Sequence, residues 1–204
     1  MKNKILQTAS QMFLSFGFKS VTMDDIAREM AISKKTIYEH YQNKKDLIRA
    51  TTHFVFENVS NRINSICENK AETSPIQALF DINDFLLDCL KEDNVAERQL
   101  QKHYPVISRS LNEKKFQLIT EGITENLVHG IDLGFYRNDF DVSVIVRLYY
   151  AASIALKDPE LFPHTTYKLP KMMHTALLYH IRGIATEKGL QELEQIMNKH
   201  KNDE

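Results

Sequence analysis

Cysteine is scarce in this sequence, with two residues in 204. Cys67 and Cys89 are too few for a disulfide framework, and the eight histidines do not gather with them into a metal-binding motif. No apolar run is long enough to cross a bilayer, and residues 2–11 lack the continuous apolar segment of a secretory signal. These absences predict a cytoplasmic protein with no metal, no cofactor and no membrane partner.

Catalytic motifs are missing as well. The six glycines form no phosphate-binding loop, and the sequence contains neither a nucleophile elbow nor a zinc-protease motif. Glu97, Arg98 and His103 are close in sequence, but no pattern places them in one pocket. We therefore expect the protein not to be an enzyme.

Strand patterns and internal repeats are also lacking, and apolar residues recur at helical spacing along most of the chain. The predicted fold class is all-α, with about ten helices. The spacing places Phe16 on the core face of the first helix. Outside residues 22–41, we expect helices over 3–16, 44–69, 76–91, 95–103, 111–133, 142–156, 170–187 and 190–199.

Charge is nearly balanced overall, at −1, but it is unevenly distributed. Residues 1–49 carry nine Lys and Arg against five Asp and Glu, a balance of +4, and the remainder carries −5. A basic end on an acidic body is typical of a protein that docks one end onto nucleic acid.

The basic end contains a stretch, residues 22–41, that predicts two short helices joined by a tight turn. Thr22 can cap the first helix, and Asp25 three residues later completes a variant of the capping box. Ser33 can cap the second helix, residues 34–41, in which Ile37 and Tyr41 are spaced to face inward. This is the arrangement of a helix-turn-helix, although a solvated helix pair in an ordinary bundle has a similar pattern.

This stretch resembles the DNA-binding domain of the tetracycline-repressor (TetR) family of bacterial regulators. The resemblance covers roughly residues 1–58 and departs from the family pattern at Ala31 and Lys35, where relatives carry glycine. A turn that needs a positive φ at Ala31 would carry a small strain. The matching positions are Thr22, Ile26, Ala27, Ser33, Thr36, Tyr38, His40, Lys44 and Leu47.

The resemblance implies a three-helix DNA-binding domain over residues 1–58, which includes the start of the linking helix 44–69. A helical effector-binding and dimerisation domain over 59–204 would follow. Cations, hydroxyls and amides at the start of a recognition helix suit phosphates and base edges. The predicted DNA contacts are Thr22, Ser33, Lys34, Lys35, Thr36, Tyr38, His40, Tyr41 and Lys44.

Helices 142–156 and 170–187 are apolar around most of their circumference, which requires burial on more than one side. That burial could lie within one monomer, but relatives in the family pair their last two major helices into a four-helix bundle. The predicted homodimer contacts are Leu148, Ala152, Leu177, Ile181 and Ile184.

The resemblance also implies a cavity for a small effector in the body. Mixed aromatic side chains and methionine suit an apolar or aromatic ligand. The predicted lining residues are Phe80, Phe85, Cys89, His103, Tyr104, Phe116 and Tyr149.

The function predicted from these observations is a dimeric, ligand-responsive repressor that leaves a palindromic operator in double-stranded DNA when a small molecule binds. The alternative is a helix-turn-helix protein that acts as an activator, or as an adaptor for another protein, without a small-molecule effector.

Overall fold

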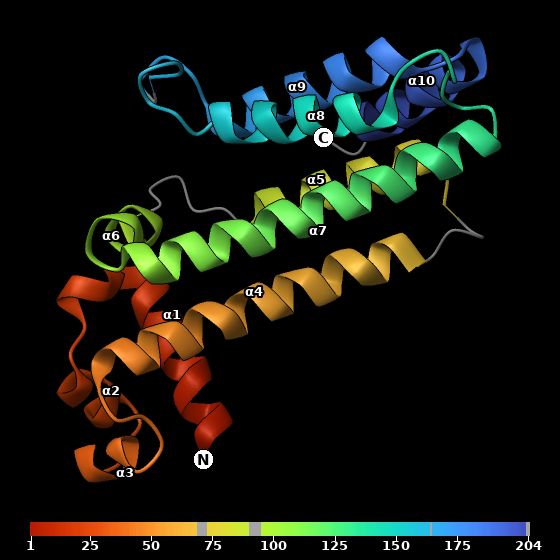
Figure 1. Cartoon of the computed structure of the whole chain (residues 1–204). Helices are drawn as coiled ribbons and strands as arrows, with labels where there is room; N and C mark the ends of the chain where they lie inside the picture. The colour runs from red at the N-terminus through yellow and green to blue at the C-terminus, as the bar shows by residue number, and fades with distance from the viewer. Residues whose placement is uncertain (69–72, 90–94, 164, 203–204) are drawn as a thin grey trace. The chain divides into compact units, whose positions relative to one another are not determined.

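We describe a computed structural model of the chain over residues 1–68, 73–89, 95–163 and 165–202 (Figure 1). Over these residues the fold is all-α, as predicted, and an isolated bridge between Tyr136 and Ala185 is the single strand-like pairing. None of the described helices is long and apolar enough to cross a membrane. The ten helices are α1 (Lys2–Ser20), α2 (Met23–Glu29), α3 (Lys34–Tyr38), α4 (Lys44–Glu68), α5 (Pro75–Cys89), α6 (Val95–His103), α7 (Pro105–Asp132), α8 (Val142–Ala155), α9 (Leu169–Ile184) and α10 (Glu187–Asn202).

The chain divides into two compact units, which we call the head and the body. The head comprises Met1–Arg62 and Lys91–Lys115, and the body comprises Ile63–Leu90 and Phe116–Glu204. The boundary predicted after residue 58 is therefore close to the first division, but the head also takes in α6 and the start of α7. Helices α4 and α7 each begin in the head and end in the body.

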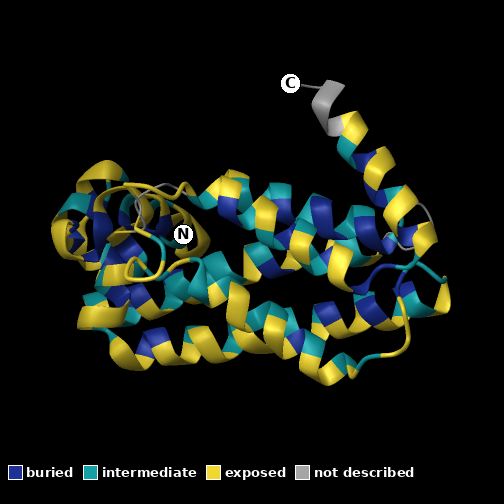
Figure 2. Cartoon of the chain, turned by 90° about the horizontal axis from the view of Figure 1, so that it is seen from above, coloured by how far each residue is buried: buried dark blue, intermediate teal, exposed yellow. Residues whose placement is uncertain are grey.

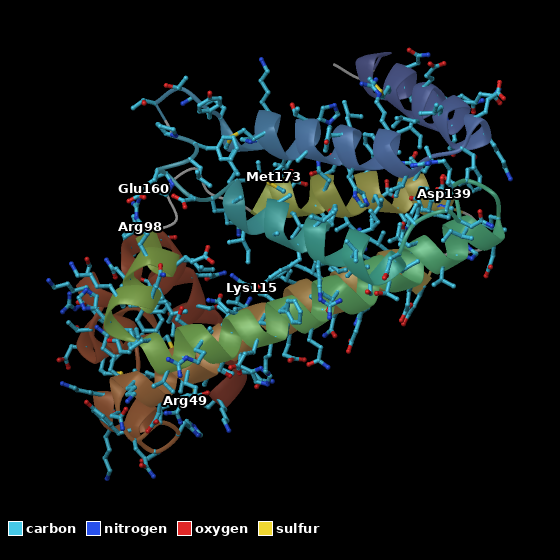
Figure 3. The ribbon with its side chains drawn as sticks, turned by 45° about the horizontal axis from the view of Figure 1, so that its top comes forward. Arg49, Arg98, Lys115, Asp139, Glu160 and Met173 are labelled. Atoms are coloured by element: carbon cyan, nitrogen blue, oxygen red, sulfur yellow. The ribbon has the colours of Figure 1, made fainter. Side chains whose placement is uncertain are left out.

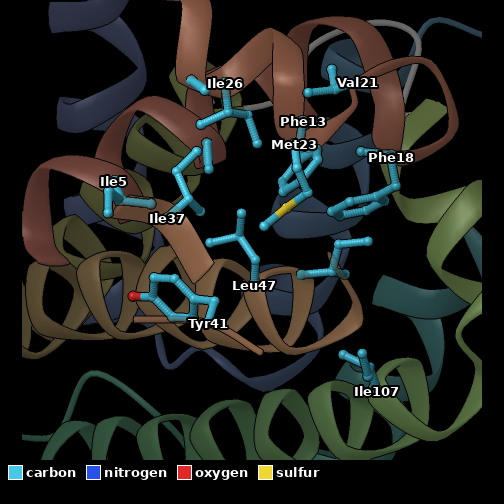
Figure 4. Close-up of a cluster of buried hydrophobic side chains, with 14 of the residues drawn as sticks. Ile5, Phe13, Phe18, Val21, Met23, Ile26, Ile37, Tyr41, Leu47 and Ile107 are labelled. Atoms are coloured by element: carbon cyan, nitrogen blue, oxygen red, sulfur yellow. The ribbon is translucent and has the colours of Figure 1, made fainter. Parts of the chain in front are cut away.

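The head is closed by one hydrophobic core (Figure 4). Ile5, Ile26, Ile37 and Leu47, from α1 to α4, are fully buried in it. Helix α6 packs against α1 and adds Leu100, which is 3% exposed. Burying a leucine side chain adds about 1.5–3 kcal/mol to the free energy of unfolding. The second segment of the head, Lys91–Lys115, therefore helps to stabilise the head.

One core residue of the first helix was predicted wrongly. Phe16 is 64% exposed, because the buried stripe of α1 runs through Ile5, Ala9 and Phe13, and Phe16 falls to the side of it. Gly17 then takes φ 80° and ψ 158°, which kinks the chain and turns Phe18 into the core. The ring centroids of Phe18 and Phe13 lie 5.1 Å apart.

Side chains of α6 and α7 hold this unit together at its surface as well. The side chain of Gln99 lies over Gly17 and accepts a hydrogen bond from the backbone N–H of Lys19 at 2.8 Å. Lys115 of α7 pairs with Glu97 of α6 at 2.8 Å (Figure 3).

Several helix boundaries differ from the prediction, three of them for a clear physical reason. Helix α3 ends at Tyr38, followed by a turn, so it is shorter than residues 34–41. Helix α7 begins at Pro105 rather than at residue 111, since proline fits the first turn of a helix as well as it breaks one. Helix α10 begins at Glu187, so Gly189 lies inside it, where a Cβ would meet the Phe135 carbonyl oxygen at 2.2 Å.

The body forms a second core around α5, which packs against α9 and α10. Buried and exposed residues alternate along its helices at helical spacing (Figure 2). Tyr136, 2% exposed, donates a hydrogen bond to Asn126, which in turn donates to the Pro75 carbonyl at 2.8 Å. Burial raises the pKa of the Tyr136 hydroxyl, so it stays a neutral donor.

Candidate nucleic-acid interface and body sites

The turn between α2 and α3 is set by short-range bonds. Thr22 caps α2 as predicted: its hydroxyl accepts the Asp25 N–H at 3.1 Å and donates to the Asp25 carboxylate at 2.7 Å. These bonds hold the pKa of Asp25 below its usual range. At the turn, Ala31 has φ 52°, the left-handed conformation that glycine adopts without steric strain. Because the Thr22 hydroxyl donates its proton to Asp25 within the cap, that proton is not available to a DNA phosphate.

Helix α3 starts on the predicted cap, Ser33, and α4 follows a similar side-chain cap. Ser33 accepts the Thr36 N–H at 3.1 Å, and the two hydroxyls share a hydrogen bond at 2.9 Å. Asn43 accepts the Asp46 N–H at 2.9 Å at the start of α4. Each cap offsets orphan amides of a first turn, and a cap of this kind contributes about 1 kcal/mol. The recognition helix α3 is thus preceded by the Ser33 cap and followed by the Asn43 cap of α4.

Three predicted DNA contacts stand free on the surface of α3 and the turn after it. Lys35, Tyr38 and His40 are exposed, and over the described residues none of their side chains makes a hydrogen bond or an ion pair. They offer a cation, a phenol and an imidazole, groups that bind phosphate oxygens and the edges of bases.

Lys34 differs from Lys35, because its ammonium group pairs with Asp24 of α2 at 2.8 Å. The hydrogen bond to Asp24 raises the pKa of Lys34. At the start of α4, Lys44 is half-buried; burial lowers its pKa, and the Asp25 carboxylate acts against that shift.

The prediction that Tyr41 contacts DNA at the surface is wrong. It is 5% exposed in the head core, and its hydroxyl is buried with no hydrogen-bond partner among the described residues (Figure 4). Burial raises the pKa of this hydroxyl. The spacing of Ile37 and Tyr41 four residues apart places both on the inner face, so Tyr41 does not belong with the outward groups.

The residues predicted to line a ligand cavity are not brought together. His103 and Tyr104 belong to the head, where Tyr104 packs on Phe18 with ring centroids 6.1 Å apart. In the body, Phe80 is buried, Cys89 is exposed, and Phe85 is half-buried. Phe116 contacts Tyr150 and Tyr149 contacts His180, as two separate ring pairs. Aromatic content alone did not identify one site.

The body instead contains a small cavity between the end of α4, the start of α5 and the middle of α7, with a volume of about 30 Å³. His129 lines it, and its Nε2 is buried without a partner among the described residues. Gly122, Asn126 and His129 follow at the spacing of one helical face, which is the sequence signal that could have indicated this wall. The other lining residues include Ile66, Cys67, Thr73 and Pro75.

The predicted dimer contacts fall into two groups. Leu148 and Ala152 of α8 are exposed, with Leu148 at 59%. Leu177, Ile181 and Ile184 of α9 are buried in the core of their own monomer, so they are wrong as dimer contacts. An apolar helix face looks alike in sequence whether it meets its own chain or a partner.

Comparison with known proteins places these features in a family. Residues 5–51 match the model of bacterial regulatory proteins of the tetR family. The chain is 33% identical over 89 residues to IcaR of Staphylococcus aureus, a negative transcriptional regulator of the biofilm operon icaADBC, covering 43% of this chain and 47% of IcaR. The chain spans less than half the length of the first curated relatives that it matches.

Solved structures match nearly the whole chain. A TetR transcriptional regulator from Legionella pneumophila superposes with a TM-score of 0.67 at 19% identity, over 90% of this chain and 97% of that one. A protein of Saccharomonospora viridis, solved in complex with choline, gives a TM-score of 0.72 at 18% identity, over 91% and 98%. At these identities the superpositions establish the fold. Residues 5–51 therefore resemble the DNA-binding domain of the tetR family of bacterial regulatory proteins, and nearly the whole chain has the fold of a solved TetR transcriptional regulator.

Proposed function

We propose that this protein is a dimeric transcriptional regulator that binds a palindromic DNA operator through the head and is released from it by a small molecule bound in the body. The observation that carries this proposal is the capped helix-turn-helix with Lys35, Tyr38 and His40 free on its surface. Two such heads about 34 Å apart would reach successive major grooves on one side of the duplex.

Dimerisation is supported by the surfaces of α8 and α9. Val144, Leu148 and Ile154 of α8 are 49%, 59% and 52% exposed, and Tyr179 of α9 is 83% exposed. A Cβ on Gly183 would meet nothing within 4 Å, which leaves room for a close helix crossing. Exposed apolar residues gathered along two helices are typical of an interface, so this face, rather than Leu177, Ile181 and Ile184, would pair with a second copy.

An effector site is supported by the body cavity. At about 30 Å³ the cavity has room for about one water, whereas ligand pockets measure about 300–1,000 Å³, so ligand binding would have to open it. The unpartnered Nε2 of His129 would then bind a polar group on an otherwise apolar or aromatic ligand. The choline complex of the Saccharomonospora viridis protein supports a small-molecule ligand in this fold but not its identity.

Regulation by repression is supported by IcaR, a negative regulator that is 33% identical to this chain over 89 residues. Since that resemblance covers less than half of each chain, the regulated gene has to be found by experiment. The protein would act without catalysis, as its family does.

The proposal is tested by binding to genomic DNA fragments at two salt concentrations, followed by footprinting of the retained fragments. We expect a protected pseudo-palindrome, and loss of that protection in Tyr38→Ala and Lys35→Ala. Lys102→Ala, which removes an exposed lysine from α6, is the control for charge and should leave the footprint unchanged. Weak, salt-labile binding with no protected site, both with and without cell extract as a source of ligand, would contradict the proposal.

A further inference from the structure

Two adjacent acids at the start of α2 have different roles. Asp25 completes the cap of α2, where it accepts from Thr22, and it also lies 3.7 Å from Arg28. Asp24 has no part in that cap; its carboxylate accepts the Lys34 ammonium of α3 at 2.8 Å. The side chains of Lys34 and Asp24 are 45% and 58% exposed, so the pair stands on the surface of the head.

The pair places an anion at the start of the recognition helix. A cation and an anion in contact have no net charge, so together they neutralise no phosphate and release no counterion. Lys35, the next residue, carries the same charge, and it forms no ion pair among the described residues. The two neighbouring lysines therefore offer DNA different charges.

We propose that Asp24 withholds Lys34 from the DNA backbone, so that the pair limits sequence-independent binding and Lys35 is left as the DNA-facing cation at the start of α3. This inference rests on the proposed DNA-binding function and concerns the same surface. Lys34, a predicted DNA contact, thereby becomes a residue that ties α3 to α2.

The energetics favour this assignment over a phosphate contact for Lys34. An exposed salt bridge is worth about 0–1 kcal/mol, so a phosphate can compete with Asp24 for the ammonium. A phosphate that takes the Lys34 ammonium, however, leaves the Asp24 carboxylate unpaired beside the DNA backbone. The repulsion between that carboxylate and the phosphates then offsets what the new contact contributes.

The experiment measures binding of the full chain to a fluorescein-labelled duplex of mixed sequence, about 30 base pairs or three helical turns long, over a series of salt concentrations. The slope of log K against log salt counts the phosphates neutralised, at about 0.9 each. The variants are Asp24→Asn, Lys34→Gln, the double variant Asp24→Asn/Lys34→Gln, and Lys35→Gln. All three positions lie on the surface, and a thermal melt of each variant checks that the head is folded.

We expect Asp24→Asn to steepen the slope by about 0.9 per head and to tighten binding about five- to tenfold at about 0.1 M salt, because Lys34 is released to a phosphate. The double variant removes a neutral pair, so it should keep the wild-type slope. Lys35→Gln should flatten the slope by about 0.9 per head.

A wild-type slope in Asp24→Asn would overturn the inference. So would a double variant whose slope is as flat as that of Lys35→Gln, since Lys34 would then already contact phosphate. Both results leave DNA binding by the wild type intact, so they are distinct from failure of the proposed function. Absence of any salt-dependent binding by the wild type would overturn both.

Discussion

The head and the body satisfy their polar groups in different ways. In the head, Thr22, Ser33 and Asn43 bond to amides within three residues, and the hydroxyl of Tyr41 is the exception, buried and unpartnered. In the body, ring nitrogens of His129 and His180 are buried without partners among the described residues, and α8 exposes a stripe of apolar side chains. The head thus pairs its capping groups locally, whereas the described part of the body holds buried ring nitrogens without partners and exposed apolar side chains.

The largest expected effect tests whether α6 belongs to the head. Leu100→Ala should lower the free energy of unfolding by about 3 kcal/mol, because it leaves a cavity in the head core, to which α1 to α4 contribute most of the buried residues. Urea denaturation followed by circular dichroism measures the change. Val95→Ala on the same helix, where the side chain is 38% exposed, is the control and should cost less than about 1 kcal/mol. Equal effects of the two variants would mean that α6 is not part of the head core.

A smaller effect tests the unsatisfied polar groups of the body. Burial lowers the pKa of His180 to about 4, against 6.5 in the unfolded chain. The unfolded state therefore binds the proton first as pH falls, and stability is lost progressively between about pH 6.5 and 4. From pH 7 to pH 5 this group should remove about 2 kcal/mol of the free energy of unfolding.

Urea denaturation at the two pH values measures this loss, and His180→Gln should reduce it by about that amount. His174→Gln, on the exposed face of the same helix, is the control and should retain the wild-type pH dependence. If both variants keep the full pH dependence, the loss of stability comes from other groups.

The smallest expected effect compares one backbone conformation in the two units. Ala31→Gly in the head should add about 0.5 kcal/mol, since glycine tolerates φ 52° but costs more entropy on folding. Gly134→Ala in the body is its reverse, at φ 75° with nothing within 4 Å of the added Cβ, and should remove about 1 kcal/mol. Changes of the same sign would show that contacts, rather than φ, control these turns.

The features that the sequence predicted well are those decided by neighbouring residues. The capping box at Thr22, the cap at Ser33 and the end of the helix predicted over 111–133 all depend on chemistry within a few positions. The same locality made the helix-turn-helix recognisable. Pro105 shows the limit of local signals, because a proline can end one helix or begin the next.

The features that failed depend on residues far away in the chain. Leu177 and Phe16 are both apolar at helical spacing, yet Leu177 is 2% exposed and Phe16 64%, because distant helices cover one and not the other. Gly189 was taken for a break, although it is required by the close approach of the Phe135 carbonyl. The lining of the cavity by His129 likewise follows from how α4, α5 and α7 meet.

The hydrogen bond between Gln99 and the backbone of Lys19 joins residues that are 80 positions apart. During synthesis, the first four helices leave the ribosome before the segment that completes their core, and residues 63–90 of the body emerge in between. A nascent chain that stops at residue 62 would lack Leu100 and the side chain that lies over Gly17. The head of this protein is therefore finished only after part of its body has been made, and a fragment that ends after α4 lacks the α6 part of the head core.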